Sequence, residues 1–171
     1  MEKELIDMAT VVDGVATLEP EVVDLPAGRV VVGLRERVSM PELAAFFGRS
    51  VPVVLDEIFR QGIEPSGPPI AIYRHEAGQV FEVTVGFPVD EPEVFRGALV
   101  IDELPRGRAV RAVHVGPYES LPETYAALRR WFSGRQVGIP RTMWEEYLQG
   151  SEAASGPSQY RTRVVYPLGQ W

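Results

Sequence analysis

The feature that most constrains the fold is a pattern that the chain carries twice. The motif Leu-Pro-x-Gly-Arg, followed by an apolar run, occupies residues 25–29 and returns at residues 104–108, an offset of 104 − 25 = 79. An aromatic-Pro-aliphatic triplet at 87–89 returns at 166–168, where 167 − 88 = 79 again. Matches that keep their order over a long period indicate an internal duplication.

Two equivalent halves follow from this repeat. We expect residues 20–90 and 97–168 to form them, with residues 1–19 as an extension that is either a tail or an extra strand. In each half, strand signals precede a helix signal, and two more strand signals follow. The chain should therefore form one pseudo-twofold domain whose halves share a ligand groove.

Local patterns place the elements more closely. Ser followed three residues later by Glu, a capping box, predicts helix starts at Ser39 and Ser120, and Ser50 before Pro52 predicts a further start. Apolar residues that alternate with polar ones predict strands. The predicted helices run to Phe47, from Ser50 to Gly62, and from Ser120 to Phe132. The predicted strands cover 21–37 (a ribbon broken by a turn), 70–75, 81–87, 98–103 with 108–115 (the ribbon of the second half), 143–148 and 160–166. Many strands with few helices predict an α+β fold, an antiparallel sheet with helices on one side.

Composition narrows the function. Hydrophobic residues make up 45% of the 171 and charged residues 24%, which is typical of one soluble globular domain. The net charge of −7 opposes nucleic-acid binding, which requires clustered cations. Without cysteine, and with only two histidines, neither a metal nor another cofactor is expected. No membrane span and no signal peptide is recognisable, so we expect a cytoplasmic protein, either a monomer or a homodimer.

Several short motifs together resemble a known family. They are His-Val-Gly-Pro-Tyr at 114–118, Glu-Glu-Tyr-Leu at 145–148, Thr-Arg-Val-Val-Tyr-Pro-Leu at 162–168, Gly-Pro-Pro at 67–69 and Phe-Pro-Val at 87–89. In this order and spacing, over roughly residues 20–168, the chain resembles the GyrI-like small-molecule-binding family.

The resemblance implies two strand–helix–strand–strand modules around a shared groove. Members of the family include effector-binding domains of multidrug-sensing regulators, stand-alone drug-binding proteins, a gyrase inhibitor, and hydrolases that open cyclopropane rings. About 20 residues before the domain are too few for a helix-turn-helix, so the expectation is a stand-alone protein that binds a small, aromatic-rich organic ligand. A hydrolase of strained or electrophilic molecules and a gyrase-inhibitor-like interaction module are the alternatives.

One departure from the family bears on ligand charge. In the family's last strand a Glu usually follows the Thr, and in cation-sensing members it neutralises a lipophilic cation. This chain has Arg163 there, and Thr84 at the matching place in the first half. If residue 163 faces the groove, an arginine would repel a cation, which favours a neutral or anionic ligand.

Glu145 and Tyr147 are the leading site candidates. Glu145 matches a family glutamate, and residues i and i+2 of a strand share a face. A carboxylate beside a phenol in an apolar groove could act as acid and base if the protein is an enzyme, or could bind a polarised ligand. The alternative is an exposed Glu145 with Tyr147 in the core. Tyr73 is the first-half counterpart of Tyr147.

The other candidates are mostly aromatic. The full predicted ligand-binding set is Tyr73, Tyr118, Trp144, Glu145, Tyr147, Arg163 and Tyr166. Trp144 has the opposite parity to Glu145, so both could face one groove only across a bulge. Arg163 is either an exposed charge or an anchor for a carboxylate. His114 in its apolar strand is expected to be a hydrogen-bonded structural residue rather than a catalyst.

Overall fold

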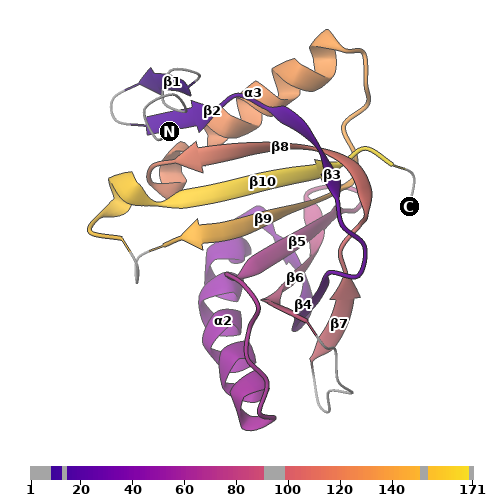
Figure 1. The fold of residues 1–171 in the computed structure, drawn as a ribbon, viewed down its shortest axis with the longest axis vertical. Helices are drawn as coiled ribbons and strands as arrows, with labels where there is room; N and C mark the ends of the chain where they lie inside the picture. Colours follow the sequence, from indigo (N-terminus) through magenta and orange to yellow (C-terminus); the bar gives the residue numbers. More distant parts are fainter. Residues whose placement is uncertain (1–8, 13–14, 91–98, 151–153, 170–171) are drawn as a thin grey trace.

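The computed structural model describes residues 9–12, 15–90, 99–150 and 154–169, and within them it shows an antiparallel sheet and two long helices (Figure 1). The strands are β1 Ala9–Val12, β2 Val15–Leu18, β3 Glu21–Leu25, β4 Val30–Ser39, β5 Ile70–His75, β6 Val80–Val89, β7 Val100–Glu103, β8 Gly107–Val115, β9 Thr142–Gln149 and β10 Arg161–Pro167. The helices are α2 Leu43–Arg60 and α3 Leu121–Gly134, with short 3₁₀ turns η1 Met40–Glu42, η2 Tyr118–Ser120 and η3 Pro157–Gln159. The predicted α+β class is confirmed.

The middle of the sheet joins the two halves of the chain. The strand order is β1-β2-β8-β10-β9-β5-β6-β4-β7, and β3 also lies beside β8. At the centre, β5 of the first half pairs with β9 of the second. Any site at this junction therefore receives side chains from both halves.

The register on either side of the junction is the same in the two halves. Tyr73 lies opposite Val83 in β6, and Tyr147 lies opposite Thr162 in β10. These partners are 162 − 83 = 79 residues apart, the offset of the sequence repeat. The register is compatible with the predicted duplication, which stays a prediction with superposition of the halves as its test.

Both helices cover one face of the sheet. Val54 and Ile58 of α2 pack against strands β4 and β6, and Leu128 and Phe132 of α3 pack against β8 and β10. Tyr73 at the centre packs against the cluster that contains Leu128 and Phe132 of α3 and against another that contains Phe46 of α2. In Figure 1, α2 and α3 lie at opposite ends of this face. No helix in the described part of the chain is long and apolar enough to span a membrane.

The opposite face has its own core under β3 and β7. It consists of Val31, Ile70, Ile72, Leu104, Ala109, Trp144 and Val165, against which Val23 and Leu25 pack. The predicted ribbon over 21–37 is therefore wrong in its pairing. β3 pairs with β8 of the other half, while β4 pairs with β6 and β7. Val23 and Leu25 of β3 are partly buried against this core, and β3 reaches it by pairing with β8 of the other half.

The first helical region is one helix rather than the two predicted. The buried residues of α2 recur every four positions and form a single stripe, which consists of Phe46, Ser50, Val54 and Ile58. Packing of this stripe against the sheet stabilises one continuous helix that includes Pro52. Ser50 is consequently buried inside the helix instead of capping one.

The two predicted capping boxes have different outcomes. At the first, the Glu42 carboxylate accepts a hydrogen bond from the Ser39 backbone N–H at 2.8 Å, at the start of η1. At the second, Ser120 makes no cap bond and its hydroxyl donates to the Pro117 carbonyl at 2.7 Å. The extension predicted for residues 1–19 contains strands β1 and β2; residues 1–8 and 13–14 lie outside the described residues.

Candidate functional site

A cavity of about 720 Å³ opens between the helix-covered sheet face and the two helical regions. Its floor is the central pair β5 and β9, its walls come from η1, the start of α2 and from α3, and its mouth includes the loop before β9. The lining residues are Met40, Leu43, Tyr73, His75, Phe81, Tyr118, Leu121, Pro122, Tyr125, Arg129, Ile139, Pro140, Arg141, Met143, Glu145 and Tyr166. Most are apolar or aromatic, as in typical pockets for small organic ligands.

Glu145 is the acidic residue on the floor of this cavity. It is only 5% exposed, and three phenols hold its carboxylate. Tyr125 donates to Oε1, while Tyr147 donates to Oε2 at 2.5 Å and Tyr73 to the same oxygen at 3.1 Å. Because an ionised carboxylate only accepts hydrogen bonds, this arrangement fits the charged form of Glu145.

The local structure explains why these groups meet. Met143, Glu145 and Tyr147 alternate along β9 and therefore share the helix-covered face. Tyr73 reaches the same point from β5, where it lies opposite Met143, and Tyr125 comes from the first turns of α3.

Tyr147 is itself held in place by aromatic neighbours. The rings of Phe47 and Tyr118 contact it edge to face, with centroids at 4.7 and 6.0 Å. Tyr147 does not line the cavity. It contacts the Glu145 carboxylate through its hydroxyl group.

The phenols around Glu145 stay protonated. Burial raises the pKa of Tyr73, Tyr125 and Tyr147 well above the ordinary value, and the negative charge of Glu145 raises it further. They therefore act as hydrogen-bond donors and not as bases near neutral pH. Within the described residues, Glu145 forms no ion pair, and three neutral donors satisfy its oxygens.

Glu146, the next residue, lies on the opposite face and is fully compensated. Arg29 donates to Oε1 at 3.0 Å and Arg163 to Oε2 at 2.9 Å, and the Trp144 indole N–H donates to Oε1 at 3.0 Å. Burial would raise the pKa of Glu146, but the charge of Arg29 and these hydrogen bonds lower it below its ordinary value. Trp144 and Arg163, both in the predicted ligand-binding set, therefore lie outside the cavity.

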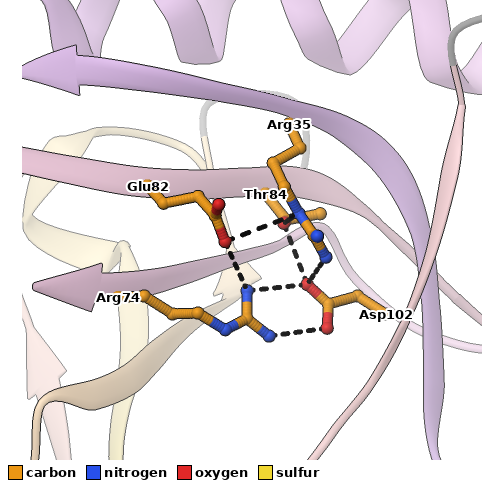
Figure 2. Close-up of polar contacts among 5 residues, drawn as sticks. All are labelled: Arg35, Arg74, Glu82, Thr84 and Asp102. Atoms are coloured by element: carbon orange, nitrogen blue, oxygen red, sulfur yellow. Dashed lines mark hydrogen bonds and ion pairs between the residues drawn. The ribbon is translucent and has the colours of Figure 1, made fainter. Parts of the chain in front are cut away.

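A second ion-pair network lies on that same opposite face (Figure 2). Asp102 of the edge strand β7 accepts two hydrogen bonds from Arg74, at 2.6 and 2.9 Å, and one each from Arg35 at 2.7 Å and Thr84 at 2.9 Å. Burial would raise the pKa of Asp102, but the hydrogen bonds and charge of Arg74, with the bonds from Thr84 and Arg35, lower it. Glu82 flanks both arginines within 3.8 Å. The network ties β7 to β4 and β5, and it places Thr84 away from the cavity.

His114 has the structural role expected from the sequence. It is completely buried, with Nδ1 2.9 Å from Thr124 Oγ1 and Nε2 3.1 Å from the Pro117 carbonyl. A carbonyl only accepts, so the proton belongs on Nε2, and Nδ1 accepts from Thr124, whose oxygen accepts from Thr17 at 2.8 Å. Burial lowers the pKa of His114, although the Pro117 bond and the charges of Glu123 and Glu145 act against this.

Some residues of the predicted ligand-binding set line the cavity, and others do not. The cavity brings together Tyr73, Tyr118, Glu145 and Tyr166, while Tyr147 supports them from behind. Sequence reasoning missed Tyr125, Arg129 and Arg141 as cavity residues. A signal for Tyr125 was its phenol, a hydrogen-bonding group in an otherwise apolar stripe. A catalytic role for Glu145 and Tyr147 stays a prediction.

Comparisons with known proteins agree on the type of domain. Residues 18–168 match the sequence model of the GyrI-like small molecule binding domain. The crystal structure of the EcmrR C-terminal domain is 18% identical, with 90% of this chain and 98% of that chain covered and a TM-score of 0.69. EcmrR in its DNA complex is 17% identical over 97% of this chain and 59% of that one, with a TM-score of 0.70.

A third solved structure is SAV2435 bound to tetraphenylphosphonium. It is 12% identical, with 88% of this chain and 94% of that chain covered and a TM-score of 0.64. Among curated proteins, none matches this chain. At these identities the structural likeness shows the fold, and the match to the family model shows the kind of domain.

Proposed function

The chain belongs to the GyrI-like small-molecule-binding family, whose sequence model matches residues 18–168, and we propose that it binds aromatic organic cations in the cavity above Glu145. The observation that carries the proposal is the buried Glu145 carboxylate with its three neutral donors. A buried charge is costly unless it is paired. Three phenols reduce this cost by hydrogen bonding, yet they leave the negative charge available to a cationic ligand.

The walls of the cavity suit the same ligands. Tyr73, Tyr118, Tyr125, Tyr166 and Phe81 present aromatic surface around the carboxylate. Aromatic rings stack on flat apolar ligands, and their negative faces attract cations by up to about 2 kcal/mol when water is excluded. The tetraphenylphosphonium in the related SAV2435 structure is a ligand of this chemistry.

This proposal reverses the ligand charge expected from Arg163. That expectation required residue 163 to face the groove. Arg163 instead lies across the sheet and pairs with Glu146 at 2.9 Å, so it does not repel a ligand in the cavity. The carboxylate that attracts a cation comes from β9 rather than from the last strand.

The test compares two probes of one shape and opposite charge. Tetraphenylphosphonium should bind, as measured by calorimetry and tryptophan fluorescence, and tetraphenylborate should not. Glu145→Gln keeps the shape and removes the charge, so it should weaken phosphonium binding by about tenfold or more. Glu64→Gln, at an exposed loop position, is the matched control and should bind like the parent. Equal binding of both probes, or an unaffected Glu145→Gln variant, would refute the proposal.

A further inference from the structure

The charges that line the cavity are separated along its length. Glu145 lies on the floor, whereas Arg129, Arg141 and His75 line the cavity at one end. Arg129 and Arg141 come from opposite walls, one from α3 and one from the residue before β9. A ligand that only satisfied Glu145 would leave this cationic end unused.

The backbone sets the spacing between the two ends. Arg141 precedes Glu145 by four residues and has the same strand parity, and its carbonyl accepts a hydrogen bond from the His75 N–H at 2.8 Å, so the β5–β9 ladder continues to it. Four strand residues span about 13 Å. Arg129 lies one helical turn, about 6 Å, beyond Tyr125, whose hydroxyl bonds Glu145. Both guanidinium groups are long enough to reach back over part of that distance.

Arg129 and Arg141 are exposed residues at the cavity, and in the part of the chain that the structure describes they form no ion pair of the kind found on the opposite face. On the opposite face, Arg29, Arg35, Arg74 and Arg163 each pair with a buried carboxylate. Within the described ranges, neither Arg129 nor Arg141 has an acidic partner, although the chain carries 24 acidic residues against 17 basic ones. Burial and the charge of Glu145 raise the pKa of Tyr166 to about 12, and the positive charge of Arg129 acts against this rise.

We propose that the cavity binds zwitterionic ligands, with the aromatic cation at Glu145 and a carboxylate or similar anionic group at Arg129 and Arg141. This rests on the proposed function and adds a second, anionic subsite to it. Arginine suits the subsite because its planar guanidinium can donate two parallel hydrogen bonds to a carboxylate. The two charged groups of such a ligand would be joined by a short tether, shorter than the roughly 13 Å between the backbone positions.

Two probes that differ only in their anionic end test the subsite. They are hexyltriphenylphosphonium and (5-carboxypentyl)triphenylphosphonium, which share the cation and the tether length. The parent protein should bind the carboxylated probe at least tenfold more tightly than the hexyl probe, as measured by calorimetry. In the double variant Arg129→Gln/Arg141→Gln this preference should disappear, while the hexyl probe should bind at least as tightly as it does to the parent, because two positive charges have been removed from the cavity that binds the cation.

The control variant is Arg130→Gln, on the same helix as Arg129. Arg130 is exposed and does not line the cavity, so the preference should survive this change. If the parent shows no preference for the carboxylated probe, or if the double variant keeps it, the anionic subsite does not exist. The proposed function would still stand in either case, provided that the hexyl probe binds and Glu145→Gln weakens it. Failure of the hexyl probe to bind would refute the proposed function itself, and with it the proposal that the ligands are zwitterionic.

Discussion

Glu145 and Glu146 are adjacent residues with the same side chain and opposite tasks. Consecutive strand residues point to opposite faces, so one carboxylate enters the cavity and the other enters the far-side core. Glu146 has two arginines and an indole as partners, and it stabilises the fold. Glu145 has phenols alone, and in the proposed function its charge is the one that attracts the ligand.

Strand periodicity predicted part of this arrangement. Glu145 and Tyr147 were placed together by their i, i+2 spacing, and Tyr73 by its position in the repeat. Strand parity set Trp144 apart from Glu145 and left the direction of Arg163 open, yet Trp144 and Arg163 both stood in the predicted ligand-binding set. Their bonds to Glu146 put them on the other face. The contact of Tyr125 with Glu145 could not be predicted, because a helix stripe shows which residues face the sheet but not which strand residue each one meets.

Buried His114 should make stability depend on pH. Its pKa is lowered in the folded state by burial, so below about pH 6.5 the unfolded chain takes up a proton that the folded chain resists. Its contribution is therefore complete above pH 6.5 and declines as the pH falls below that value. The free energy of unfolding from urea titrations at pH 8 and pH 5 should fall less for His114→Asn than for the parent.

Carboxylates also titrate at acidic pH, and for that reason the comparison uses the difference between variants. His75→Gln, at an exposed position, is the control and should keep the pH dependence of the parent. If His114→Asn is too unstable to measure, NMR titration of the parent gives the same answer. A His114 that titrates at or above pH 6.5 in the folded protein would contradict the prediction.

At the scale of elements, which strands pair with each other depends on contacts between residues that lie far apart in the chain, and local sequence patterns do not reveal these contacts. The strands themselves were largely predicted, because alternation and turn residues are local signals. The predicted partners of β3 and β7 were wrong, because each strand was expected to form a ribbon with the next strand of its own half. Each pairs with a strand of the other half, β3 with β8 and β7 with β4, and the Asp102 network holds β7 there from across the sheet. The position of β3 is stabilised by packing of the partly buried Val23 and Leu25 against residues far away in the chain.

The pairing of β4 with β6 requires glycine at one point. Gly33 lies opposite Gly86, and a Cβ on Gly86 would lie 2.0 Å from the Val32 carbonyl oxygen. Because backbone must move to admit it, Gly86→Ala should lower the free energy of unfolding by about 3 kcal/mol. Gly48→Ala is the control: it lies in α2 with nothing near its added Cβ, and it should raise stability by about 0.5–1 kcal/mol. Urea unfolding followed by circular dichroism measures both, and a neutral Gly86→Ala would contradict the close approach.

The whole molecule should behave as one cooperative unit. The site needs both halves, since Tyr73 comes from the first and Glu145 from the second. The halves are joined by the central β5–β9 pair and by the two exchanged strands, so neither half has a complete sheet without the other. The sequence repeat predicted two halves and a shared groove, but it could not show that the halves exchange strands.

This cooperativity can be measured because the tryptophans mark one half. Trp131, Trp144 and Trp171 all follow residue 97, so their fluorescence reports on the second half, whereas far-ultraviolet circular dichroism reports on the entire chain. In the parent, both signals should show one urea midpoint with the same slope. Gly86→Ala lies in the first half, and it should shift the tryptophan midpoint by the same amount as the circular dichroism midpoint. If the two halves were independent, the tryptophan transition would stay where the parent has it while the circular dichroism transition split into two steps.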